Sequence, residues 1–118
     1  MAASLIGCGR TLVTVSGTPQ QVAVPAAIAG PGLPGLSTVH AFVVSALSTN
    51  TGKVYIGTVG LNKTTLANTL VVLAIPTVNL IPTFSCSLTA AANALSLSDL
   101  YIDADNANDG VLISAVVA

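Results

Sequence analysis

The sequence predicts an all-β protein, an antiparallel β-sandwich or jelly roll of about eight short strands in a single domain over residues 1–118. Two observations support this fold class. Short apolar or alternating runs recur along the chain, and clusters of glycine, proline, asparagine and serine separate them. In addition, no stretch has the apolar spacing of a convincing amphipathic helix.

The strands follow from these runs in order. The expected strands are residues 11–15, 20–24, 37–47, 53–59, 70–75, 83–88, 101–104 and 111–117. Residues 1–10, which precede the first strand, are expected to form an N-terminal arm. Residues 25–36 are rich in glycine and proline, which prevent a regular ladder of hydrogen bonds, so a long loop is expected there.

Three of the expected strands, residues 37–47, 70–75 and 111–117, are apolar on both faces. Only one face of a strand meets the core of a two-sheet sandwich, so the other face needs cover from elsewhere. We therefore expect a homo-oligomer, or a subunit docked on a larger assembly. The residues expected to form this interface are Phe42, Val44, Leu70, Val72, Val111, Ile113 and Val116.

The composition supports association and excludes one class of partner. Hydrophobic residues make up 53% of the chain, charged residues only 6%, and the net charge is −1. A net charge near zero gives little repulsion between copies, which favours association. The basic residues are Arg10, Lys53 and Lys63, and three scattered cations cannot neutralise a run of phosphates, so no nucleic-acid partner is expected.

No membrane partner is expected either. The longest apolar tract, residues 70–81, is shorter than the roughly 20 residues that a spanning helix needs, and Pro76 and Asn79 interrupt it. The first apolar region is too short for a signal peptide and no basic residue precedes it, so no export signal is expected.

Few residues offer catalytic chemistry. His40 is the single histidine, and its apolar neighbours favour a packed or interface position over a general base. The chain has no glutamate and no G-x-S-x-G motif, so neither an enzyme nor a cofactor is expected. Cys8 and Cys86 have no C-x-x-C spacing; buried free thiols are favoured, and a disulfide remains an alternative.

The acidic residues gather near the end of the chain, and the sequence DADNANDG over residues 103–110 invites a calcium interpretation. Asp103, Asp105 and Asp109 are weak metal candidates. Against a calcium loop, Ala107 occupies a ligand position and no glutamate follows. Asparagine, aspartate and glycine tolerate left-handed turn geometry, so a tight turn between two strands is the favoured interpretation.

Four segments resemble small virion proteins of tailed bacteriophages, of the capsid decoration or cement type. They are residues 49–57 (TNTGKVYIG), residues 97–104 (LSDLYIDA), Asp109-Gly110-Val111, and residues 13–20 (VTVSGTPQ). The segments are spread over most of the chain.

This resemblance implies a compact β-sandwich or jelly roll, typically trimeric, made in the host cytoplasm and located on the capsid surface. The implied function is structural: the protein binds the shell of major capsid protein and stabilises it. The alternatives are a tail, baseplate or head-fibre module and, less favoured, a carbohydrate-binding jelly roll. The resemblance implies no catalytic residues.

Overall fold

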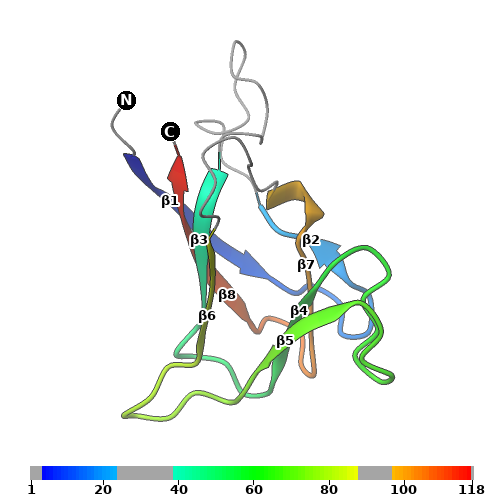
Figure 1. Cartoon of the computed structure of the whole chain (residues 1–118). Coiled ribbons are helices and arrows are strands. Elements are labelled where there is room, and N and C mark those ends of the chain that lie inside the picture. Colours follow the sequence, from blue (N-terminus) through cyan, green and yellow to red (C-terminus); the bar gives the residue numbers. More distant parts are fainter. Residues whose placement is uncertain (1–3, 24–38, 88–96, 118) are drawn as a thin grey trace.

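Two four-stranded antiparallel sheets face each other across the core of the computed structural model, which describes residues 4–23, 39–87 and 97–117 (Figure 1). One short 3-10 turn, η2, leads into the seventh strand. In chain order the elements are β1 (Ser4–Leu12), β2 (Gln20–Gln21), β3 (Val39–Ala46), β4 (Val54–Gly57), β5 (Thr69–Leu73), β6 (Thr83–Ser87), η2 (Leu97–Asp99), β7 (Tyr101–Ala104) and β8 (Gly110–Val117).

The strand order is that of a jelly roll. One sheet has the order β1-β8-β3-β6 and the other β2-β7-β4-β5. The last strand thus lies between the first and the third, and the seventh lies between the second and the fourth, as in two nested Greek keys. The predicted fold class is therefore confirmed.

The core lies between the two sheets, and both contribute aliphatic side chains to it. Removing these side chains from water is the main force that holds one sheet on the other. The rings of Phe42 and Phe84 meet there in a tilted arrangement, with their centroids 6.1 Å apart. The largest fully buried apolar side chains are Ile56, Leu97, Ile102, Ile113, Val13, Val39, Val44, Val54 and Val111.

The first strand begins earlier than the sequence indicated. Residues from Ser4 onward pair with β8, from Ser4↔Val117 to Leu12↔Gly110. The expectation of an N-terminal arm over residues 1–10 is therefore wrong from Ser4 onward. The glycines that disguised the strand form a β-bulge: the register shifts between Gly7 and Gly9, and Gly9 has φ +73°.

A second bulge changes the faces of β3. The register shifts between Val39 and Ala41, so the chain carries one extra residue, His40, at this point. Val39 and Phe42 consequently both reach the core, although strict alternation had placed them on opposite faces. The side chain of His40 lies outside the described part of the structure.

The remaining boundaries agree with the sequence to within a few residues, except in β2. This strand is only Gln20–Gln21, with one further hydrogen bond from the Val22 N–H to the Leu100 carbonyl (3.1 Å). The expected loop over residues 25–36 lies outside the described residues. In the described ranges, no helix has both the length and the apolar character needed to cross a membrane.

Candidate functional site

The carboxylate of Asp109 fastens the β3–β4 loop to the turn that precedes β8. It is buried and accepts hydrogen bonds from the backbone N–H groups of Thr51 (3.0 Å) and Gly52 (2.8 Å). Beside it, the Asn50 side chain pairs with the Gly110 backbone: Nδ2 donates to the carbonyl (2.8 Å), and Oδ1 accepts from the N–H (2.9 Å). The amide side chain of Asn50 thus occupies the place of a strand partner.

A second buried carboxylate, Asp103, fastens the β1–β2 loop. Its Oδ1 accepts the Gly17 N–H (2.9 Å) and the Ala104 N–H (2.8 Å). The Ala104 carbonyl in turn accepts the Ser16 hydroxyl (2.7 Å) and the Lys63 ammonium (2.8 Å), and Lys63 also donates to Ser16. The end of β7 therefore joins the β1–β2 and β4–β5 loops.

Asp105 is exposed, and its Oδ1 accepts the Tyr55 hydroxyl (3.0 Å). Partial burial raises the pKa of Tyr55. The hydrogen bond to Asp105 and the negative charges of Asp105 and Asp103 raise it further.

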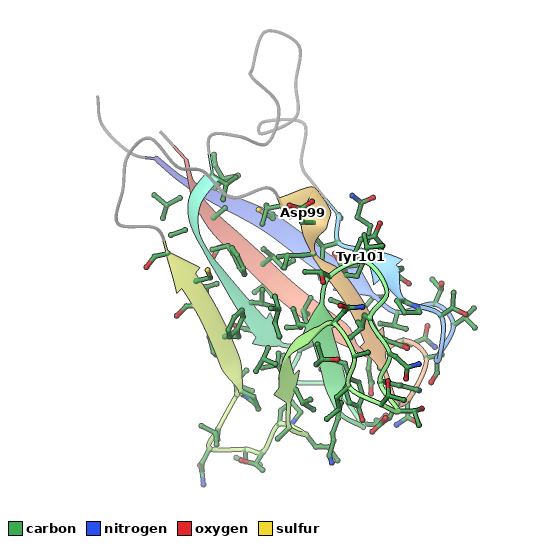
Figure 2. All side chains as sticks on the ribbon, turned by 45° about the vertical axis from the view of Figure 1, so that its right-hand side comes forward. Asp99 and Tyr101 are labelled. Atoms are coloured by element: carbon green, nitrogen blue, oxygen red, sulfur yellow. The ribbon has the colours of Figure 1, made fainter. Side chains whose placement is uncertain are left out.

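These contacts separate the three weak metal candidates. Asp103 accepts the Gly17 N–H, Asp105 the hydroxyl of Tyr55 on β4, and Asp109 the Gly52 N–H, so the three carboxylates have different partners. Asp99 lies with η2 at the other end of β7, next to Tyr101 (Figure 2). Among the described side chains, no group of three or more histidine, cysteine, aspartate or glutamate residues could hold a metal ion. Asp103 and Asp109 act as anchors for loops, whereas Asp105 binds the Tyr55 side chain.

The two cysteines are free and partly buried against the core. Burial raises the pKa of the Cys8 thiol. Cys8 lies on β1 and Cys86 on β6, at opposite edges of one sheet. Three strand spacings, about 14 Å, separate these edges, so the two residues are too far apart for a disulfide within the chain. The free-thiol interpretation holds and the disulfide alternative does not.

Four of the seven expected interface residues belong to the core. Each lies on the inward face of its strand, so it cannot form a contact with another subunit. They are Phe42, Val44, Val111 and Ile113. Both faces of these strands are apolar in sequence, and only the packing of the second sheet distinguishes the inner from the outer face.

The other three interface candidates remain at or near the surface. Leu70 and Val72 are exposed on β5, and Val116 is half-buried on β8. Nearer the start of β8, Leu112 is exposed on the outer face of its sheet.

A larger apolar surface was missed from the sequence. Residues 74–82, here called the apolar loop, connect β5 to β6 and expose Ile75, Val78, Leu80 and Ile81. The sequence showed residues 70–81 as the longest apolar tract, but the whole tract was weighed only as a membrane-spanning segment. The available signal was a run of large aliphatic residues with no charged neighbour.

Comparison of the chain with family models, with curated proteins and with solved structures finds no match.

Proposed function

We propose that this protein is a structural virion protein, a capsid decoration or cement protein that binds the shell of major capsid protein and stabilises it. The observation that carries the proposal is the contrast between the buried polar side chains and the exposed aliphatic side chains. Buried polar groups hold loops together, whereas large aliphatic side chains are exposed to solvent. Such a surface suits a protein that works by binding other proteins.

The segments that resemble virion proteins give further support. Asn50, Thr51, Gly52, Asp103 and Asp109 all belong to these segments, and each takes part in a loop-anchoring hydrogen bond. The resemblance therefore concerns residues that build the loops of the sandwich. A related architecture would need the same residues for the same physical reason.

In this proposal the protein acts as a homo-oligomer on the capsid surface, with a trimer as the expected state. Each copy contributes a modest apolar contact. Once one copy of an oligomer is bound, its other copies are held near their own sites at a high effective concentration. The overall affinity of the oligomer for the capsid is therefore higher than that of a single contact. Bridging neighbouring capsid subunits in this way opposes their separation.

The test uses capsids that lack this protein. Purified protein is mixed with them, and cosedimentation and the thermal disruption of the shell are measured. Binding that saturates at a fixed ratio to the capsid protein, together with a raised disruption temperature, is the expected result. Absence of binding, or binding with no gain in shell stability, contradicts the proposal.

Labelled electron microscopy of whole particles separates a capsid role from the structural alternative. Label spread over the shell is expected. Label confined to the tail, the baseplate or a head fibre would assign the protein to that part of the particle.

A further inference from the structure

The longest part of the chain without charge runs over residues 64–98, which hold no Asp, Glu, Lys, Arg or His. It includes β5, the apolar loop and β6. Within it, the apolar loop lies at the same end of the sandwich as the β3–β4 and β7–β8 connections and extends beyond the sheets (Figure 1). At its tip, Val78 is 102% exposed and Leu80 66% exposed.

The apolar loop is held in shape. Thr77 and Leu80 exchange two backbone hydrogen bonds, Thr77 N–H to the Leu80 carbonyl (2.9 Å) and Leu80 N–H to the Thr77 carbonyl (3.3 Å). Pro76 and Pro82 bracket this turn and restrict the backbone on both sides. A preorganised loop loses little conformational entropy when it docks, so its exposed side chains can contribute more of their burial energy to binding.

The exposed apolar area is large enough to form most of an interface. Aliphatic side chains exposed along β5 and the apolar loop present roughly 500 Å² per copy, near the upper end of the ~300–600 Å² found for the largest patch on a typical monomer. A standard interface buries about 800 Å² per partner. The contributing residues are Leu70, Val72, Ile75, Val78, Leu80 and Ile81.

The lack of charge points to the kind of partner. A lipid surface is usually bound with basic or aromatic residues beside the apolar ones, and residues 64–83 have neither. The aromatic residue opposite Val72 in register is Tyr55, and its hydroxyl donates a hydrogen bond to the carboxylate of Asp105. Where identical copies meet about a two-fold or three-fold axis, a charge beside that axis would approach the same charge on the neighbouring copies. A charge-free apolar patch avoids this repulsion and is complementary to itself.

We infer that β5 and the apolar loop form the surface through which one copy of this chain binds a second copy. This inference rests on the homo-oligomer of the proposed function and assigns its interface. The charged residue nearest to this surface in the strand register is Lys53. It comes directly before Val54, which pairs with Leu73 at the end of β5, so Lys53 lies beside the base of the apolar loop. The outer face of the other sheet, with Leu112, remains available for another contact.

The test compares the mass in solution of three proteins by sedimentation equilibrium over a wide concentration range. The wild-type chain is expected at a multiple of its 11.6 kDa monomer mass. The double variant Val78→Asn/Leu80→Asn should shift toward the monomer, with the dissociation constant raised at least about 100-fold. Leu112→Asn, a change at a 51% exposed leucine on the other sheet, should keep the wild-type mass.

A second variant, Val78→Asp, guards against a folding defect because this side chain is fully exposed. It should dissociate the oligomer by placing like charges across the interface, while its melting temperature, measured at concentrations where both proteins are monomeric, stays that of the wild type. A monomeric wild-type chain at all concentrations, or an oligomer that both tip variants leave unchanged, overturns the inference.

Capsid binding measured on the same variants separates this inference from the proposed function. A loop-dependent oligomer that binds no capsid supports the interface and contradicts the capsid role. The opposite outcome is a monomeric wild-type chain that binds capsids, with binding lost in Val78→Asn/Leu80→Asn. That outcome supports the capsid role and contradicts the interface between copies, because the apolar loop then docks on capsid protein.

Discussion

At the scale of single residues, two buried aspartates determine how the loops are arranged. Asp103 and Asp109 each accept two backbone N–H groups, from Gly17 and Ala104 in one case and from loop residues after Asn50 in the other. Hydrogen bonds to a charged acceptor are about twice as strong as those between neutral groups. A buried carboxylate is tolerated here because donors replace the water that it loses.

Replacing Asp109 by asparagine should lower the free energy of unfolding by about 1.5–3 kcal/mol, the usual contribution of hydrogen bonds to a charged group. The new amide would also direct N–H groups at the donors of Thr51 or Gly52. Urea unfolding followed by circular dichroism measures the change. Asp99→Asn is the control, since this side chain is exposed, and it should alter stability by less than about 0.5 kcal/mol. Equal losses in both variants would contradict the anchoring role.

Gly110 is required by close packing of two strands. A Cβ at this position would lie 2.1 Å from the Thr11 carbonyl oxygen, so β1 and β8 would have to separate. Gly110→Ala should therefore cost about 3 kcal/mol, at the upper end of overpacking effects. Gly7→Ala, in β1, meets nothing within 4 Å and should unfold at nearly the wild-type urea concentration. A tolerated Gly110→Ala would show that the strands are less tightly packed than described.

The hydroxyl of Tyr55 should titrate above its usual range, since burial, the Asp105 hydrogen bond and nearby negative charge raise its pKa. The folded state then holds this proton more tightly than the unfolded state. Its contribution to stability is complete below the unfolded pKa near 10 and is lost as pH rises through the raised folded pKa. Phenolate absorbance in a Tyr101→Phe background measures the titration. Asp105→Asn should lower the midpoint, and an unchanged midpoint would contradict the contact.

At the scale of elements, alternation assigns most strands, and bulges explain where it fails. In β8, Val111, Ile113 and Ala115 face the core, whereas Leu112 and Ser114 face outward. Two apolar neighbours in such a strand are chemically alike in sequence, but only one is buried. Stability should therefore distinguish them.

Ile113→Ala should reduce the free energy of unfolding by about 2–5 kcal/mol, because it removes buried methyl groups and leaves a cavity. Leu112→Ala, one residue away on the exposed face, should cost less than about 1 kcal/mol. Chemical denaturation of both variants at the same protein concentration checks the difference. Similar costs would mean that the outer face of this sheet is also buried, for example in an oligomer.

At the scale of the whole molecule, the first and last strands close one sheet together. β1 pairs with β8 along its whole length, and β8 in turn pairs with β3. The chain must therefore bring its two ends together before this sheet is complete. Such long-range pairing is typical of proteins that fold slowly.

Deleting residues 1–10 tests the revised role of this segment. An N-terminal arm could be removed without loss of the sandwich, but removal of most of β1 leaves β8 without its outer neighbour. The truncated chain should lose its cooperative unfolding transition or aggregate through the exposed strand. Deletion of residues 1–3 alone, which precede β1, should preserve the transition. A stable, cooperative chain lacking residues 1–10 would restore the arm interpretation.

Local sequence was sufficient to predict the all-β class, most of the strands and the turn between β7 and β8, in which Asn108 has φ +72°. Periodicity and turn-forming residues act over a few neighbours, so these features can be recognised without the rest of the chain. The strand hidden by Gly7 and Gly9 and the extra residue in β3 were missed because a bulge breaks the period. Both bulges lie in strands that pair with β8, and β8 follows roughly a hundred residues after β1. Local sequence therefore does not contain the partner that defines them.

Packing of the two sheets decided what sequence could not, namely which apolar face is the core and what the aspartates do. Ile113 and Leu112 differ only in which side of one strand meets the opposite sheet. Asp103 and Asp109 looked like one acidic loop, but their partners Gly17 and Gly52 come from other parts of the chain. Folding brings these donors to the carboxylates, and that juxtaposition of distant segments makes them loop anchors.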